Sequence, residues 1–196
     1  MVPRADAADT TANKMRAVAW DALRARIHDQ AHLNHSLAVE AITREMAAKS
    51  DDADQWALAG LLHDIDIGTT ADDLSRHGIV GAAILRDLGM SDAVVHAVAA
   101  HDDHTGIPRT SRLDHAVYCA DQIYWLIADA GLPFPSDKLR TVTADYVWQQ
   151  IRAMPAKAMV VGKVSNECAL IGLTMSRALD VALAGLRKAS LSADVR

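Results

Sequence analysis

The chain has 196 residues, a mass of 21.1 kDa and a formal net charge of −5 at pH 7. This length suits one well-filled core rather than two independent domains. The acidic balance lacks the basic surface typical of proteins that bind duplex nucleic acid. No apolar run reaches the roughly 18 residues that a membrane span needs, and the start of the chain lacks the apolar region of a secretory signal.

The cysteines indicate the cellular compartment in which we expect the protein. The chain has two cysteines, Cys119 and Cys168, and both lie in apolar helical patterns. This placement predicts buried thiols rather than a disulfide framework. Together with the missing signal and membrane span, it leads us to expect a cytoplasmic protein.

Apolar residues recur three and four positions apart along most of the chain, and alternating strand patterns are missing. The sequence therefore predicts an all-α protein, a single compact bundle of about seven to eight helices over residues 13–190, after a disordered segment 1–12. Asp51 or Asp52, Ser91 and Ser111 are the expected N-caps. The helices are expected near residues 13–28, 32–49, 53–65, 76–88, 92–102, 112–130, 137–154 and 165–189.

Polar residues inside apolar stripes are the most informative ones. His63 and Asp64 end the most apolar run of the chain, Leu58-Ala59-Gly60-Leu61-Leu62. A charged carboxylate at the end of a buried helix is costly unless it is paired or bound to a metal ion. For this segment alone, a buried hydrogen-bonded pair and a metal-binding pair both stay open.

Other predicted helices show the same feature. His35, His77 and His101 each lie on an apolar stripe, and Asp121 lies between Tyr118 and Tyr124 in an apolar run. A lone buried histidine needs no special explanation, but a set of this size with two carboxylates points to one shared polar centre. Two histidines and two aspartates suit a divalent ion such as Mn, Fe, Co, Mg or Zn.

The order His, His-Asp, Asp resembles the HD-domain superfamily of metal-dependent phosphohydrolases. The resemblance covers residues 30–130 or so, which would hold the metal-site core, and the C-terminal helices would complete the bundle. The blocks that carry it are Asn34-His35-Ser36-Leu37-Ala38-Val39, Leu61-Leu62-His63-Asp64-Ile65-Asp66, His77-Gly78-Ile79-Val80-Gly81, Ala97-Val98-Ala99-Ala100-His101 and Ala116-Val117-Tyr118-Cys119-Ala120-Asp121.

The resemblance implies a ligand set. His35, His63, Asp64 and Asp121 match the four shared metal ligands, with Asp64 able to bridge two ions. His77 and His101 match the extra histidines of the dinuclear branches. One or two divalent ions are implied, from among Fe, Mn, Co, Ni, Zn and Mg.

The function that the resemblance implies is hydrolysis of a phosphate ester of a small nucleotide or related metabolite by a metal-activated water. Asp64 and His101 are the expected catalytic residues. Arg76, His104 and Arg109 are candidates to hold a substrate phosphate, although a solvated surface role is the simpler interpretation of the arginines. Asp66, Asp102 and Asp103 are candidates for a base or an orienting partner, or for helix caps.

Two alternatives stay open. A di-iron oxygenase of the myo-inositol oxygenase type would use the same four histidines and two aspartates, and a non-catalytic ligand-binding module would use the fold alone. The C-terminal stripe with Val160, Val161, Leu170, Ile171 and Leu173 is expected to complete the bundle or to pack a homodimer. No membrane partner and no duplex nucleic acid is expected.

Overall fold

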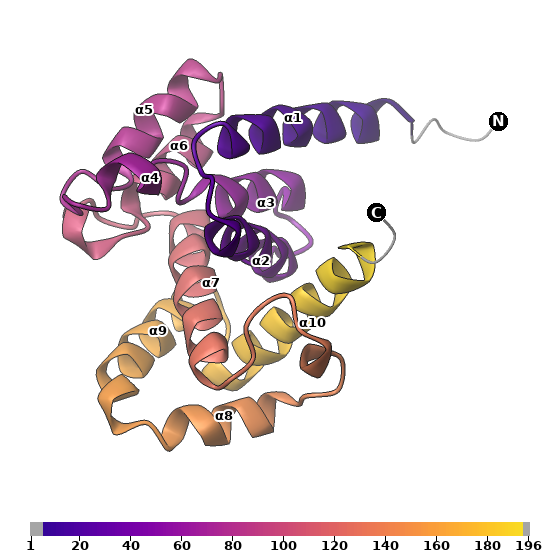
Figure 1. The fold of residues 1–196 in the computed structure, drawn as a ribbon, viewed down its shortest axis with the longest axis vertical. Helices are drawn as coiled ribbons and strands as arrows, with labels where there is room; N and C mark the ends of the chain where they lie inside the picture. The colour runs from indigo at the N-terminus through magenta and orange to yellow at the C-terminus, as the bar shows by residue number, and fades with distance from the viewer. Residues whose placement is uncertain (1–5, 194–196) are drawn as a thin grey trace.

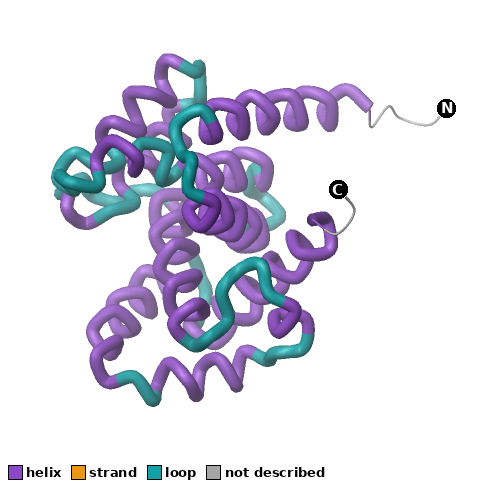
Figure 2. The backbone as a smooth tube through the Cα atoms, in the orientation of Figure 1, coloured by secondary structure: helices purple, strands orange, loops and turns teal. Residues whose placement is uncertain are grey.

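The structure is a computed structural model, and it describes residues 6–193. This part of the chain contains ten α-helices, three short 3-10 helices and no strand, which confirms the all-α prediction (Figure 2). The elements are α1 (Asp6–Arg24), α2 (Gln30–Met46), α3 (Ala53–Leu62), α4 (Ile67–Thr70), α5 (Ile79–Asp87), α6 (Asp92–Ala100), η1 (Asp103–Thr105), α7 (Arg112–Asp129), η2 (Asp137–Arg140), α8 (Ala144–Arg152), η3 (Pro155–Lys157), α9 (Ala158–Leu170) and α10 (Met175–Ala193).

Helices α2 and α7 are the centre of the bundle. Helix α2 packs against α3, α7 and α10, and α7 also packs against α6 and α9. In Figure 1, α1 to α6 form one part of the molecule, α8 to α10 form the other, and α7 runs between them. Buried apolar side chains from both parts belong to one hydrophobic cluster. The central helices are therefore held on several sides, which gives the side chains that they carry well-determined positions.

Two glycines set how closely the neighbours of α2 approach it. A Cβ atom on Gly60 of α3 would lie 2.6 Å from Thr43 Oγ1 and 2.8 Å from the carbonyl oxygen of Val39. A Cβ atom on Gly185 of α10 would lie 2.5 Å from the carbonyl oxygen of Ala41. Real Cβ atoms do not come this close to backbone atoms, so both crossings need glycine.

Several helix starts follow the local sequence chemistry that was used to predict them. The side chains of Asp52, Ser91 and Ser111 accept backbone N–H hydrogen bonds at the starts of α3, α6 and α7. Ser111 and Asp114 form a reciprocal capping box, which satisfies two N–H groups that the helix itself leaves unpaired. These three boundaries were accessible from sequence because a cap acts over only a few residues.

The number of helices was underestimated. The expected helix 165–189 is two helices, because Gly172 has φ +83° and ends α9 just after Leu170. The expected helix 137–154 begins as the separate 3-10 turn η2, and the loop after Asp66 contains the short helix α4. Residues 6–12, predicted to be disordered, belong to α1, and residues 1–5 lie outside the described residues.

The two cysteines are free and buried, as predicted, with their Sγ atoms 3.2 Å apart between α7 and α9. Among residues 6–193, no single helix is long and apolar enough to cross a membrane. Segments Pro155–Leu170 and Met175–Leu191 satisfy that criterion by length and composition only as a pair, across a bend of 84°.

Candidate metal centre

The structure brings six of the predicted site residues into one buried cluster. The four histidines are at most 3% exposed, and the two aspartates are 9% exposed. They come from α2 (His35), the end of α3 (His63 and Asp64), the turn before α5 (His77), the end of α6 (His101) and the middle of α7 (Asp121).

Asp64 divides this cluster into two halves. Its Oδ2 lies 3.4 Å from His35 Nε2 and 3.3 Å from His63 Nε2. Its Oδ1 lies 3.1 Å from His77 Nε2 and 3.5 Å from His101 Nε2. Each half, a histidine pair with one Asp64 oxygen, has the ligand-atom spacing of a metal site. One carboxylate therefore stands between two ligand sets.

Asp121 belongs to the first half only. Its Oδ1 lies 3.2 Å from His35 Nε2 and 3.8 Å from His63 Nε2. Its other oxygen accepts a hydrogen bond from Gln122 Nε2 at 2.9 Å. The first half thus has a second carboxylate. The hydrogen bond from Gln122, the next residue on the same helix, limits the orientation of this carboxylate.

Helix ends orient two of the histidines. His63 Nδ1 donates to the carbonyl oxygen of Gly60 at 2.8 Å, and His101 Nδ1 donates to that of Val98 at 2.7 Å. Both carbonyls lie in the last turn of their helix, where backbone oxygens have no partner within the helix. Each ring is therefore held with Nε2 pointing into the cluster, as ligand histidines usually are.

The donor set fits a cation. With Nδ1 donating outward, the Nε2 atoms of His63 and His101 carry lone pairs in the neutral rings. Those atoms face His35 Nε2 at 3.0 Å and His77 Nε2 at 3.1 Å. Such nitrogen pairs are favourable only with a proton or a metal ion between them, and imidazole with carboxylate suits the first-row divalent metals.

The electrostatics of the cluster lead to the same conclusion. Burial by itself lowers the pKa of His35, but Asp121 and Asp64 outweigh it and raise that pKa to about 9. Burial likewise opposes protonation of His77, but Asp64 and Asp66 raise its pKa to about 10. Burial disfavours the charged form of Asp64, yet the surrounding histidines hold its pKa well below the usual range. The centre therefore attracts positive charge.

Asp66 is the orienting partner of His77. This aspartate is 1% exposed, and its Oδ1 lies 2.9 Å from His77 Nδ1. Its Oδ2 accepts backbone N–H bonds from Gly78 at 2.9 Å and Gly81 at 2.7 Å. Gly78 has φ +77°, a conformation that favours glycine. The sequence offered Asp66 only as one of three candidates, and its closeness to His63-Asp64 was the available signal.

The three residues proposed to hold a phosphate are not alike. Arg109 donates to the carbonyl oxygen of Ala100 at 3.1 Å and pairs with Asp103 at 2.9 Å and Glu167 at 3.1 Å. These contacts and its stacking over the Tyr118 ring at 4.1 Å make Arg109 a link between the 103–109 loop and α9, and its predicted role in holding a phosphate stays a prediction.

His104 and Arg76 both lie on the surface. His104 Nδ1 lies 2.6 Å from Asp102 Oδ1, and its side chain is 62% exposed. Arg76, next to His77, is exposed and makes no side-chain hydrogen bond or ion pair within the described part of the chain. Neither belongs to the buried cluster, so their predicted role in substrate binding stays a prediction.

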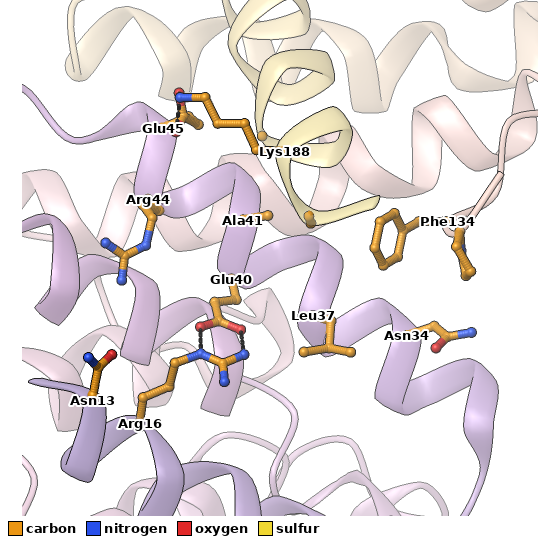
Figure 3. Close-up of a pocket in the computed structure, with 13 residues that line it drawn as sticks. Asn13, Arg16, Asn34, Leu37, Glu40, Ala41, Arg44, Glu45, Phe134 and Lys188 are labelled. Carbon is orange, nitrogen blue, oxygen red and sulfur yellow. Dashed lines mark hydrogen bonds and ion pairs between the residues drawn. The ribbon is translucent and has the colours of Figure 1, made fainter. Parts of the chain in front are cut away.

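A cavity of about 560 Å³ lies elsewhere, along α2 between α1 and α10 (Figure 3). None of the six clustered residues lines it. Its charged residues are paired with one another or with neighbours: Arg16 Nη2 donates to Glu40 at 2.7 Å, Lys188 pairs with Glu45 at 2.7 Å, and Arg44 pairs with Asp54 at 2.7 Å. The cavity is therefore separate from the metal centre.

Part of the chain is similar to known proteins. A family model described as HD domain matches residues 33–126. Ribonuclease Y of Oleidesulfovibrio alaskensis is 36% identical over 92 residues, which cover 46% of this chain and 17% of that protein. Ribonuclease Y of Chloroflexus aurantiacus is 40% identical over 70 residues, covering 35% and 14%. The chain thus spans less than a fifth of the curated relatives that it matches. No solved structure matches it significantly.

Proposed function

Residues 33–126 of this chain are an HD domain, and on that premise we propose that the chain hydrolyses a phosphate ester of a small nucleotide with divalent metal ions held by the buried cluster. The observation that carries the proposal is the position of Asp64, with one carboxylate oxygen toward each histidine pair. The matched relatives, which are named ribonuclease Y, support a metal-dependent phosphohydrolase of this family.

The six clustered residues would together hold two ions. His35, His63 and Asp121 would hold the first ion, His77 and His101 would hold the second, and Asp64 would bridge them. The carboxylates of Asp64 and Asp121 supply the negative charge that offsets the ions in a buried site. The Nδ1 contacts of His63, His77 and His101 hold the rings in the ligand orientation before any ion binds.

When bound, such ions lower the pKa of a coordinated water and neutralise charge on the phosphoryl oxygens. The chain itself fixes the positions of the ligand residues and excludes water from them. The cluster is least buried at its carboxylates, because the histidines are at most 3% exposed while Asp64 and Asp121 are 9% exposed. His101 would act as a ligand through Nε2, because its Nδ1 donates to the carbonyl oxygen of Val98.

The nucleotide class of the substrate is supported by two observations. The cluster is buried, which favours a compact phosphoryl group over a broad surface. The net charge of −5 gives no basic surface for a long nucleic-acid backbone. A small nucleotide or a chain end fits both observations. Arg76 and His104 are the candidates for the remaining phosphate contacts.

The test combines metal analysis with a substrate panel. Protein purified without chelators is expected to contain transition metal and to hydrolyse nucleotide phosphate esters, and chelation should abolish the hydrolysis. Asp64→Ala should lose both metal and activity while staying folded by circular dichroism. Asp137→Asn, whose side chain is 94% exposed, is the matched control and should retain both.

Two results would overturn the proposal. Full metal content and full turnover in Asp64→Ala would leave His63 and Asp64 as a buried structural pair. Dioxygen consumption by the iron-loaded protein, with no hydrolysis of any phosphate ester in the panel, would favour the di-iron oxygenase alternative.

A further inference from the structure

Trp125 is an exposed aromatic side chain beside the metal centre. It lies on α7, one turn after Asp121, and is 47% exposed. The other three tryptophans are less accessible: Trp56 is buried, and Trp20 and Trp148 are half-buried. A single exposed apolar residue is ordinary on a protein surface. The position of Trp125 relative to the cluster is what distinguishes it.

The indole of Trp125 stacks on the imidazole of His35. Their ring centroids are 4.9 Å apart and their planes are inclined by 30°. Tyr124 meets the same indole at 5.3 Å and 74°, which is an edge contact. His35 therefore covers one face of the indole. Because about half of the residue is still accessible, the exposed area falls mainly on the opposite face.

Trp125 lies close to the least buried part of the centre. Asp121, one turn before Trp125 on the same helix, is one of the two least buried residues of the cluster. Gln122 lies between them in sequence, and its amide is occupied by the Asp121 carboxylate. A ligand near this rim thus meets a flat aromatic surface, with the neighbouring amide already hydrogen-bonded to the protein.

We infer that Trp125 is the platform on which the base of a nucleotide substrate stacks while its phosphate reaches the metal centre. The inference rests on the proposed function. It adds that the protein also binds the base of the substrate, away from the phosphate. Stacking on an indole is tolerant of sequence, since every base has a π-face. The site therefore selects for an aromatic base without reading which base it is, and purines, with the larger face, bind more tightly than pyrimidines.

The platform also explains why an apolar ring of this size is left exposed on a helix that is otherwise buried. Tyr124 and Trp125 are adjacent, yet Tyr124 is 5% exposed and contacts the His35 ring at 4.7 Å, with the two aromatic rings 5.3 Å apart. Two neighbouring aromatic rings thus contact the imidazole of His35. The outer ring performs two tasks, because it holds a ligand histidine on one face and offers the other face to substrate.

The experiment measures binding rather than turnover. Calorimetry compares adenosine 5′-monophosphate with ribose 5-phosphate, which has the same phosphate and sugar but no base. Unaltered protein is expected to bind the nucleotide about 5- to 150-fold more tightly, the range expected for one stacked base. Trp125→Ala should remove that preference, and Trp125→Phe should retain most of it. Tyr146→Ala, which removes an equally exposed aromatic ring on α8, is the control and should leave the preference unchanged.

Each outcome decides the inference. Equal affinity of unaltered protein for the two ligands overturns it. If Trp125→Ala weakens both ligands alike or lowers the metal content, the indole acts only as a cover for His35, and the inference is overturned as well. Loss of the base preference alone supports it. Because the measurement needs no catalysis, a lost preference together with absent hydrolysis would retain the platform and reject the proposed reaction.

Discussion

Asp66 Oδ1 lies 2.9 Å from His77 Nδ1, and the Nε2 of the same imidazole lies 3.1 Å from Asp64 Oδ1. The ring of His77 is thus held between two carboxylates that are two residues apart in the chain. The second oxygen of Asp66 is bonded to the backbone N–H groups of Gly78 and Gly81. The aspartate therefore ties the start of α5 to the metal centre.

This relationship predicts a local effect of Asp66→Asn. The amide cannot accept all three hydrogen bonds that the carboxylate accepts, so His77 should lose its fixed orientation. Loss of such a supporting partner lowers metal affinity by about 10- to 100-fold. We expect the reduction in the half with His77 and His101 and not in the half with His35 and His63. Metal titration followed by elemental analysis measures it, with Asp73→Asn in the neighbouring exposed loop as control. Unchanged affinity in both halves would contradict the role of Asp66.

The two aspartates of the centre should differ in how many ions they affect. Asp64 faces all four histidines, whereas Asp121 faces only His35 and His63. Asp64→Ala should therefore deplete both ions, and Asp121→Ala should deplete one. Metal per chain, measured by mass spectrometry after identical purification, distinguishes the two variants. Equal losses in both variants would argue against a bridging position for Asp64.

His101→Ala separates a one-metal from a two-metal centre. If two ions are bound, the variant should lower the stoichiometry from about two toward one, because a direct ligand disappears. If one ion is sufficient, stoichiometry should hold and only turnover should fall. Circular dichroism of the same preparation checks that the helical fold persists. The geometry around Asp64 leads us to expect the first result.

Stability should depend on pH through Asp114, away from the metal centre. Burial alone would raise the pKa of Asp114, but N–H bonds from Thr110 and Ser111 and a bond from His96 lower it. A lowered folded-state pKa means that the contribution is complete above the unfolded value of about 3.9 and is lost as pH falls through the folded value.

The corresponding variant is Asp114→Asn. It should cost about 1–3 kcal/mol in the free energy of unfolding at pH 7, since a buried acceptor of several hydrogen bonds is altered. The difference from unaltered protein should begin to shrink below about pH 4, where Asp114 becomes protonated in the unfolded chain, and should be smallest once the pH lies below the lowered folded-state pKa. Denaturant unfolding at a series of pH values measures it. A difference that stays constant down to pH 3 would show that the charge of Asp114 is not involved.

Two glycine substitutions test the close contact between α10 and α2. Gly185→Ala places a Cβ atom 2.5 Å from the carbonyl oxygen of Ala41 and should destabilise the fold by about 1–3 kcal/mol through overpacking. Gly162→Ala, in α9 with nothing within 4 Å of the new Cβ atom, should instead stabilise by about 0.5–1 kcal/mol. Chemical denaturation of both variants provides the comparison. Similar stability of the two would contradict a tight contact between α10 and α2.

The clustering of the six polar residues was predictable because burial is costly for a charged or polar group without a partner. His35, His63 and Asp121 each stand in an apolar stripe that can be read from the chain alone. Helix caps such as Ser111 were predictable for a different reason, since a cap and its N–H partners are only a few residues apart. Both signals are local, so both can be recognised in the sequence without knowledge of the fold.

Other features depend on partners that are distant in the chain. Arg109 is bound to Glu167, 58 residues away, and no local pattern distinguishes that arginine from one free to hold a phosphate. Trp125 follows Tyr124 in an apolar run, yet it is 47% exposed while Tyr124 is 5% exposed, a difference that the run itself does not show. Local periodicity establishes which helix faces are apolar, and it leaves open which faces meet.

Composition and patterning were therefore enough for an all-α chain and for the identity of the clustered residues, because helical periodicity and the cost of buried charge act within one segment. The division of those residues into two halves around Asp64 came from the way the helices cross. Gly60 and Gly185 let α3 and α10 lie close against α2, and the close approach of α3 brings His63 and Asp64 beside His35. Distances of this kind arise between segments, so the residue pattern within any one segment does not contain them.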